Sequence, residues 1–396
     1  MRYSLVSDLT RELASVLRGY PAFVLSPHAA PPAAHVPVFV YHSIEPRAFE
    51  RDLAFLADNR YRTIGMAELV RHLRGGGAAP RSVVLTFDDA RSSFWRYGYP
   101  LLERYGMRGV LFVIAGLTLD APSCRPNLSA VRDGACTPAD IEALDPDDVT
   151  LCTWPELAHM QASGVVEVES HSLFHREVFV GTEIVGFIAP DTPLVPYATP
   201  ATAYLDHEDV GRPLARERLL GLPLFRAAPL YAAPRAFRVP PDLRRFARGL
   251  WDGLSDRERS PSACRRVLRE RWRRVDAAAR LERWTETEIA AAIAEDLALA
   301  RELIKTRVGA TAGAHFCVPY GSAGAATLAA AARLGIESVC WGVIPGKKHN
   351  APGDSPFEVA RLKCDFLRRL PAANRASLAA IYGHKALRRL RGERVY

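Results

Sequence analysis

Three short clusters in the sequence contain residue types that can bind a metal ion and move protons. The first is the dipeptide Asp88-Asp89, which follows an apolar run at 83–87. The second spans 171–175 and has a histidine at each end. The third spans 316–321 and ends in Pro-Tyr-Gly. Each cluster lies at or just after an apolar run of strand length, and in parallel α/β folds such strand ends converge into functional sites.

The first cluster offers two carboxylates with separate partners. Buried carboxylates are costly unless they are paired, hydrogen-bonded or bound to a cation. On an extended backbone Asp88 and Asp89 point in different directions, so they can do different chemistry. The dipeptide taken alone favours a simpler interpretation, in which one residue caps a helix and the other is an exposed acid.

The second cluster supplies two imidazoles, those of His171 and His175. This spacing places both side chains on one side of a helical turn, where they can share a metal ion. A histidine pair alone is moderate evidence. One aspartate and two histidines, each at a strand end, match the three protein ligands and open position of a catalytic divalent site.

The third cluster is weaker evidence, because Pro-Gly turns are common. A strand that ends in Pro319, Tyr320 and Gly321 nevertheless gives a fixed turn with exposed backbone N–H groups. Such a group can stabilise an oxyanion.

Strands and helices alternate around these clusters. Apolar, β-branched runs predict strands at 36–41, 83–87, 110–114, 165–168, 314–318, 337–341 and 358–366. Apolar spacing predicts helices at 3–18, 49–59, 66–74, 97–105, 153–162, 286–305 and 324–334. Thr153 and Glu156 form a capping box at the start of one of them. Alternation of this kind predicts parallel strands joined by crossover helices.

The regular pattern fails between residues 176 and 283, which are rich first in proline and then in arginine. We therefore expect a large insertion that borders the cleft. The predicted parts are an N-terminal helix and linker (1–35), a first barrel part (36–175), the insertion (176–285), a second barrel part (286–370) and a basic C-terminal helix or tail (371–396).

Taken together, Thr-Phe-Asp-Asp, His-Ser-x-x-His and Pro-Tyr-Gly, in that order, resemble the motifs of the polysaccharide deacetylases, also called NodB-homology domains or carbohydrate esterase family four. The resemblance covers about residues 36–175 and 286–366. It implies an α/β fold, a distorted (β/α) barrel, and removal of acetyl groups from N-acetylated sugars. It also implies one divalent metal ion, which we expect to be zinc, with nickel or cobalt as alternatives.

Carried over to this sequence, the resemblance assigns the metal to Asp89, His171 and His175. Asp88 is then the general base that activates a water molecule. The backbone N–H of Tyr320 would help to hold the oxyanion, and a general acid must protonate the departing amine.

The sequence departs from the commonest family pattern in two places. Cys317 stands where many members have an arginine, and we expect Arg361 to replace it. No late Leu-x-His motif supplies the general acid, and His349 is a poor match. His42, in Val-Tyr-His-Ser, is the better candidate, because the arrangement is similar to the biofilm poly-N-acetylglucosamine deacetylases with their early Tyr-His. Structural roles for His42 and Arg361 remain open alternatives.

We therefore expect a metal-dependent hydrolase that removes an N-acetyl group from a sugar, glycan or sugar conjugate, with Pro319 and Trp341 contacting the substrate. One alternative keeps the fold but changes the bond, giving an O-acetyl esterase or another linear-amide hydrolase. A second alternative is a catalytically weak glycan-binding relative.

The charge distribution bears on the partner. Residues 211–284 contain 19 arginines and eight acidic residues, so a surplus of 11 positive charges lies there and the rest of the chain has a net charge of −3. Five arginines of this segment have helical spacing: Arg265, Arg266, Arg269, Arg273 and Arg274. They form either a solvated helix face or a surface for an anionic, nucleotide-linked or lipid-linked sugar.

Other partners and the location are less constrained by the sequence. Nothing resembles a nucleic-acid recognition module, a membrane surface is only weakly indicated, and the oligomeric state is not encoded in any pattern that we can read. The first 25 residues lack a continuous apolar segment, and the seven cysteines contain no CxxC. We therefore expect a cytoplasmic protein with reduced thiols.

Overall fold

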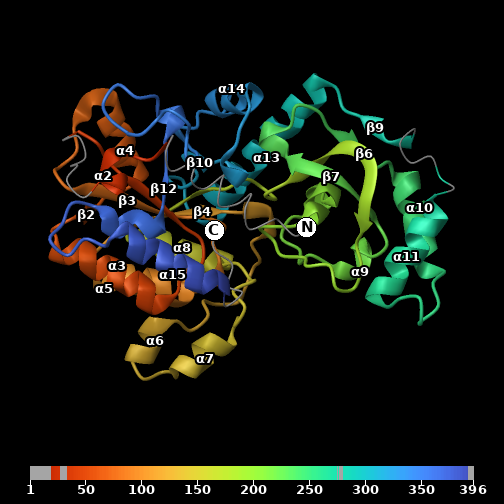
Figure 1. Ribbon diagram of the computed structural model, residues 1–396, viewed down its shortest axis with the longest axis horizontal. Helices are drawn as coiled ribbons and strands as arrows, with labels where there is room; N and C mark the ends of the chain where they lie inside the picture. The colour runs from red at the N-terminus through yellow and green to blue at the C-terminus, as the bar shows by residue number, and fades with distance from the viewer. Residues whose placement is uncertain (1–18, 27–33, 274, 276–279, 391–396) are drawn as a thin grey trace.

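The structure is a computed structural model that describes residues 19–26, 34–273, 275 and 280–390. Its main feature is an eight-stranded parallel sheet with the order β11-β10-β5-β4-β3-β1-β12, in which β2 also pairs with β3. The sheet is coloured from red to blue on the left of Figure 1. Its strands are β1 Val38–Tyr41, β2 Arg62–Thr63, β3 Ser82–Phe87, β4 Gly109–Val113, β5 Val166–Ser170, β10 His315–Cys317, β11 Ser338–Cys340 and β12 Leu362–Lys363.

The segment before β12 closes the curled sheet. Val359 donates a backbone hydrogen bond to Val339 of β11 and accepts one from Trp341, the residue after that strand. A few residues later, Leu362 pairs with β1. The same short segment therefore touches both ends of the strand order, and the predicted distorted α/β barrel is confirmed.

Two apolar layers surround the strands. One fills the barrel interior and includes Val38, Val84 and Phe112. The other lies between the strands and the outer helices and includes Phe39, Leu85 and Leu111. Successive residues of each strand thus point to opposite faces, and both faces are buried, as expected for parallel strands covered by helices.

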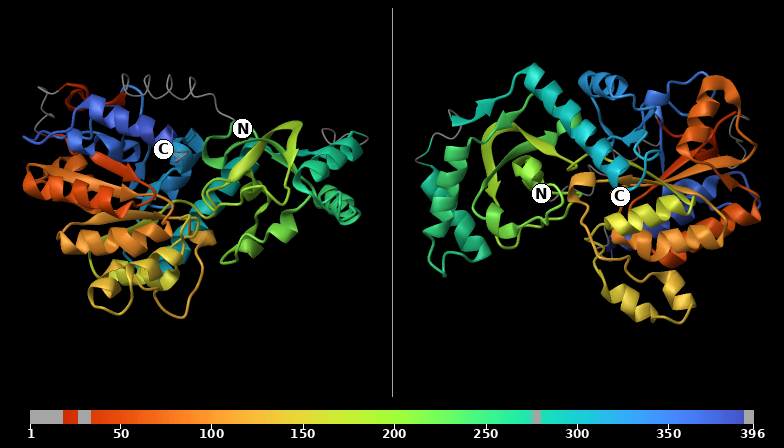
Figure 2. Two further views of the ribbon diagram at one scale, coloured as in Figure 1. Left: turned by 60° about the horizontal axis from the view of Figure 1, so that its bottom comes forward. Right: turned by 180° about the vertical axis from the view of Figure 1, so that it is seen from behind.

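Helices pack outside this barrel, as Figures 1 and 2 show. Their bounds are α2 Ala22–Leu25, α3 Pro46–Asp58, α4 Met66–Arg71, α5 Tyr99–Arg104, α6 Leu128–Arg132, α7 Pro138–Ala143, α8 Trp154–Ala162, α13 Glu286–Arg307, α14 Ala325–Arg333 and α15 Leu378–Leu390. The expected capping box of Thr153 and Glu156 begins α8. The predicted helix at 3–18 lies outside the described residues, and the strand predicted at 358–366 is correct only at β12.

The segment after residue 176 is more regular than its sequence pattern indicates. It forms a second, antiparallel sheet with the order β7-β6-β8-β9, on the right of Figure 1. Its strands are β6 Glu177–Phe187, β7 Pro223–Pro229, β8 Phe237–Arg238 and β9 Glu282–Arg283. Helices α9 Arg216–Leu219, α10 Pro241–Asp252 and α11 Pro261–Trp272 accompany this sheet. The sequence analysis predicted an insertion here but not its strands, because proline and arginine at strand edges and on exposed helix faces hid the apolar pattern.

The insertion has its own apolar core, which includes Phe179, Phe225, Leu243 and Trp272. The long helix α13 follows it in the chain and runs between the two sheets (Figure 2). Within the described residues, no helix is both long and apolar enough to cross a membrane.

Candidate metal centre

Asp88 and Asp89 lie at the carboxyl end of β3, and both are buried. Asp89 and the following Ala90 have φ angles of 70° and 56°, in the left-handed region. Non-glycine residues reach this region at a cost and persist there where the surroundings hold them. The turn directs the two carboxylates to different partners, so the alternative of a helix cap followed by an exposed acid was wrong.

The loop that carries His171 and His175 follows β5 and is not helical. Ser172 and His175 have φ angles of 79° and 51°, and the His175 N–H donates to Ser172 Oγ at 2.8 Å. The prediction of a helical turn was therefore wrong. The two imidazoles still come together, with ring centroids 4.9 Å apart, because the loop reverses direction between them.

Asp89 and the two histidines form a compact group. Asp89 Oδ1 lies 3.7 Å from His171 Nε2 and 4.0 Å from His175 Nε2. All three side chains are buried, and their ligand atoms lie within 4.8 Å of one another. These separations allow one ion to form bonds of about 2.0–2.2 Å to each residue.

The surroundings of the two imidazoles favour metal binding. His171 Nδ1 contacts the Cys317 carbonyl oxygen at 2.8 Å, which leaves Nε2 facing Asp89. Such a backbone contact fixes the ring orientation of a ligand histidine. His175 Nδ1 is buried without a hydrogen-bond partner in the described part of the chain. Burial and the neighbouring His171 lower the pKa of His175 well below its usual value, so this ring is neutral and can donate a lone pair.

Arg91 completes the environment of Asp89 and was missed by sequence reasoning. Its Nε and Nη2 donate to Asp89 Oδ2 at 3.0 and 2.9 Å, which leaves Oδ1 facing the histidines. Burial raises the pKa of Asp89, although Arg91 opposes the change. The position of Arg91 in the sequence gave little indication of this role, because arginines are frequent throughout the chain. The residues present therefore fit one divalent cation.

Asp88 faces a different cation, the guanidinium of Arg361. Arg361 Nη1 and Nη2 donate to the two carboxylate oxygens at 2.6 and 2.8 Å. Arg361 Nε also donates to the Trp341 carbonyl oxygen at 2.6 Å, which fixes the orientation of the guanidinium group. Burial raises the pKa of Asp88, but Arg361 and His171 outweigh it and hold that pKa well below its usual range. Arg361 is thus the arginine that contacts Asp88, as expected from the absence of an arginine at position 317.

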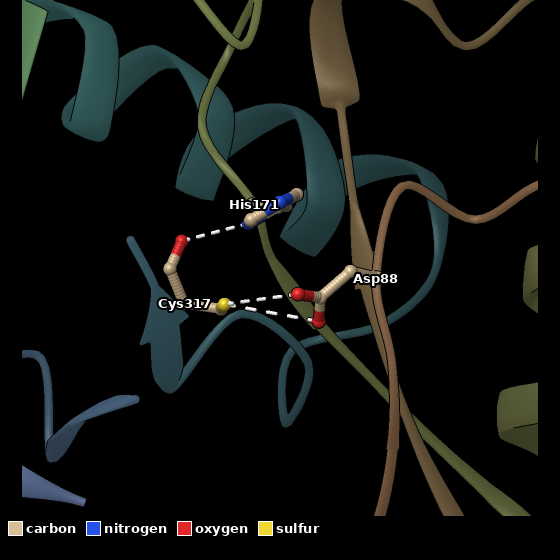
Figure 3. A group of neighbouring side chains, drawn as sticks. All are labelled: Asp88, His171 and Cys317. Atoms are coloured by element: carbon tan, nitrogen blue, oxygen red, sulfur yellow. Dashed lines mark hydrogen bonds between the residues drawn. The ribbon is translucent and has the colours of Figure 1, made fainter. Parts of the chain in front are cut away.

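Cys317 lies beside the same carboxylate (Figure 3). Its thiol is 3.8 and 3.7 Å from the two oxygens of Asp88, and its carbonyl oxygen contacts His171. Asp88, His171 and Cys317 form a second group with metal-ligand spacing. Burial raises the pKa of the Cys317 thiol well above its usual value. A thiol binds a metal as its thiolate, and both carboxylate oxygens of Asp88 already accept hydrogen bonds from Arg361. The group formed by Asp89, His171 and His175 is therefore the better metal site.

His42 and Tyr320 form the accessible side of the centre. His42 Nε2 lies 3.9 Å from Asp88 Oδ2, and 28% of its side chain is exposed. Burial, opposed in part by Asp88, lowers the pKa of His42 to about 4. The Tyr320 ring lies 4.4 Å from that of His175, and Tyr320 is 44% exposed. A substrate can approach from this side, since the metal-site residues themselves are buried.

The two residues expected to contact substrate lie near the centre but have structural contacts. Pro319 is buried at the turn before Tyr320. Trp341 is partly buried, and its indole N–H donates to the Phe357 carbonyl oxygen at 2.7 Å. A substrate role for Pro319 and Trp341 stays a prediction.

Comparison with known proteins agrees with this geometry. Residues 75–193 match the family model described as polysaccharide deacetylase. The poly-beta-1,6-N-acetyl-D-glucosamine N-deacetylase of Escherichia coli (strain K12) is 27% identical over 137 residues, which cover 33% of this chain and 18% of that protein. The protein YxkH of Bacillus subtilis (strain 168) is 31% identical over 90 residues, which cover 20% of this chain and 32% of that protein.

A solved structure shares the fold. The deacetylase domain of BpsB from Bordetella bronchiseptica aligns with a TM-score of 0.50 and 18% sequence identity, over 85% of this chain and 97% of that one. The family model includes the Asp88-Asp89 turn and the loop of His171 and His175. The resemblance expected from the three motifs is therefore confirmed, and residues 75–193 match the polysaccharide deacetylase family.

Proposed function

We propose that this protein is a divalent-metal-dependent hydrolase that removes N-acetyl groups from a glycan. The observation that carries the proposal is the pairing of two adjacent aspartates with separate partners. Asp89 faces His171 and His175, whereas Asp88 faces Arg361 and, on the accessible side, His42. The E. coli relative bears the name of an N-deacetylase of a poly-N-acetylglucosamine, which supports this substrate class.

The residues have separate roles in this proposal. Asp89, His171 and His175 would hold the cation, with zinc expected and nickel or cobalt as alternatives. A cation in this position supplies a Lewis acid for the substrate carbonyl and lowers the pKa of a bound water. Asp88 accepts a proton from the attacking water, and Arg361 keeps the carboxylate ionised and oriented. The backbone N–H of Tyr320 would help to hold the developing oxyanion.

His42 would act as the general acid. Cleavage of the amide C–N bond requires that the departing nitrogen receive a proton. With a pKa of about 4, His42 is neutral near pH 7 and must first take up a proton. Asp88 lies 3.9 Å away and is a weak base, so the proton that it accepts from water can pass to the imidazole.

The test is acetate release from β-1,6-linked N-acetylglucosamine oligomers by protein reconstituted with zinc, nickel or cobalt. We expect release that depends on the added ion and stops with a chelator. His42→Ala should retain the ion and lose about 10²–10⁴-fold in kcat, the usual contribution of a general acid. A His42→Ala variant with near-normal turnover would refute the acid role. Absence of release from every N-acetylated oligomer by ion-loaded protein would refute the proposed reaction.

A further inference from the structure

A cavity of about 160 Å³ lies at the junction of the barrel and the insertion. Leu117, from the loop after β4, contributes to its wall on the barrel side, and Leu205 contributes on the insertion side. Four arginines also line it: Arg212, Arg218, Arg244 and Arg248. None of these residues belongs to the metal centre. Guanidinium groups around one cavity favour a planar or tetrahedral oxyanion, which they can hold through paired N–H donors.

The two acidic residues of the cavity are already engaged. Asp209 accepts from Arg218 Nη1 at 2.5 Å and from the Asp206 N–H at 3.0 Å. Asp206 accepts from the Glu208 N–H at 3.0 Å. Asp252, outside the cavity lining, pairs with Arg248, so three carboxylates stand against four guanidinium groups and leave a surplus of one positive charge. The cavity therefore has a net preference for an anion.

Arg244 and Arg212 are the arginines that can donate hydrogen bonds to a bound anion. Arg244 is half-buried and donates to two carbonyl oxygens, those of Val239 at 2.9 Å and Tyr204 at 3.4 Å. Among the described residues, Arg218 pairs with Asp209 and Arg248 with Asp252, whereas no ion pair is found for Arg244 or Arg212. Burial lowers the pKa of Arg244, although Tyr204 and the nearby carboxylate of Asp206 oppose the change, so an anion bound here would further offset the cost of burying this charge.

The cavity is connected to the metal-binding loop by backbone contacts. The Gly211 N–H donates to the Gly116 carbonyl oxygen at 2.8 Å, and the Gly116 N–H donates to the Leu173 carbonyl oxygen at 2.7 Å. Leu173 lies between the two histidines of the metal centre. On the other side, Arg176, which follows His175, donates to the Leu205 carbonyl oxygen. A ligand in the cavity would thus sit beside the loop that positions the metal site.

We propose that this cavity is a binding site for a compact oxyanion of the phosphate or carboxylate class, held by Arg212 and Arg244. The oxyanion can be a substituent of the glycan, an assignment that rests on the proposed function, or free inorganic phosphate. The cavity is separate from the arginines on α11, of which Arg265 is paired with Asp191 and Arg271 with Glu258.

Calorimetric titration with inorganic phosphate at constant ionic strength tests the site. The wild-type protein should bind phosphate saturably, with no such response to chloride. The double variant Arg212→Gln/Arg244→Gln should bind at least about tenfold more weakly, since it lacks both charge-assisted donor groups. Arg226→Gln, an exposed arginine on β7 outside the cavity, is the matched control and should bind as the wild type does.

Arg212 is exposed, so Arg212→Gln alone should fold and still weaken binding several-fold if the double variant does not fold. Equal phosphate binding by the wild type and the Arg212→Gln variant, or a wild-type response no different from that to chloride, would overturn the site. Competition then separates the two sources. A phosphorylated or carboxylated N-acetylglucosamine oligomer that displaces phosphate, where the neutral oligomer does not, identifies a glycan substituent. Failure of both oligomers to displace phosphate identifies free phosphate. The titration needs no turnover, so its failure is distinct from failure of the proposed reaction.

Discussion

Asp88 and Asp89 show how neighbouring residues of one type acquire different chemistry. Arg361 donates two hydrogen bonds to Asp88 and lowers the pKa of that carboxyl group. At Asp89 the effect of burial dominates and raises the pKa. The sequence shows two carboxylates and two histidines but not which atoms face each other. The separation arises from the left-handed turn at Asp89 and from Arg361, which lies 273 residues away from Asp88 in the chain.

The division of labour predicts different results for the two aspartates. Asp88→Asn should retain about one bound divalent ion and lose at least about 10²-fold in kcat, because the amide cannot accept the proton. Asp89→Asn should lose the ion. Metal analysis and acetate release on both purified variants check this prediction. Loss of the ion from Asp88→Asn, with retention by Asp89→Asn, would require the two roles to be exchanged.

Arg361 should be structurally as well as chemically important. Arg361→Ala leaves Asp88 as a buried charge without its partner, which costs about 3–5 kcal/mol in unfolding free energy. Urea denaturation at pH 7 measures this loss. Arg368→Ala, which removes a more exposed partner of Asp52, is the control and should cost about 1 kcal/mol or less. Equal losses of unfolding free energy in the two variants would show that the buried ion pair contributes no more to stability than the exposed one.

The loop after β5 shows what can and cannot be predicted at the level of an element. Its apolar strand and two histidines are evident in the sequence, but its path depends on distant partners. Asp296 on α13 accepts from the Leu173 N–H at 2.9 Å and from the Tyr231 hydroxyl of the insertion. No local pattern links a residue of a long helix to a loop 123 residues earlier. The non-helical path of the loop could therefore not be predicted.

Asp296 should position the metal-binding loop. Asp296→Ala leaves the buried Leu173 N–H without an acceptor, which costs about 1–3 kcal/mol. Asp296→Asn retains an acceptor oxygen and should lose less. We expect the alanine variant to have a lower melting temperature and a faster loss of the bound ion to a chelator. A chelation rate unchanged in Asp296→Ala would show that this contact does not support the loop.

At the scale of the whole molecule, the barrel was predictable because most of its strands lie in apolar runs between helices, although the short strand β2 was not predicted. The insertion was not, because long-range antiparallel pairing between β6 and β7 leaves only a weak alternating pattern. The closing segment around Val359 was only partly predictable, since a single residue bridges to β11 before β12 begins. Local patterns thus identified the barrel, and tertiary contacts determined the remainder.

Buried histidines predict how the stability of the folded protein depends on pH. Burial lowers the pKa of His35 to about 3 and that of His315 to about 4. In the unfolded chain both should titrate near about 6.5. As pH falls from about 6.5 towards 4, the unfolded chain takes up protons that the folded protein excludes, so each histidine removes up to about 1.4 kcal/mol of stability per pH unit.

Urea denaturation at pH 7, 5.5 and 4.5 checks this dependence. His315→Gln should lose less stability than the wild type between pH 7 and 4.5, although it is less stable at pH 7. His207→Gln, which alters an exposed histidine, should follow the wild type. A His315→Gln variant with the full wild-type slope would show that this residue is not buried in its neutral form.

The central claim is that Asp89, His171 and His175 hold one catalytic divalent ion. The most direct measurement is the metal content of the purified, reconstituted protein and of its His171→Ala variant, with the exposed His207→Ala as the control. We predict about one equivalent of zinc, nickel or cobalt in the wild type and the control, and its loss from His171→Ala. Absence of metal from the reconstituted wild type, or equal metal in His171→Ala, would contradict the claim.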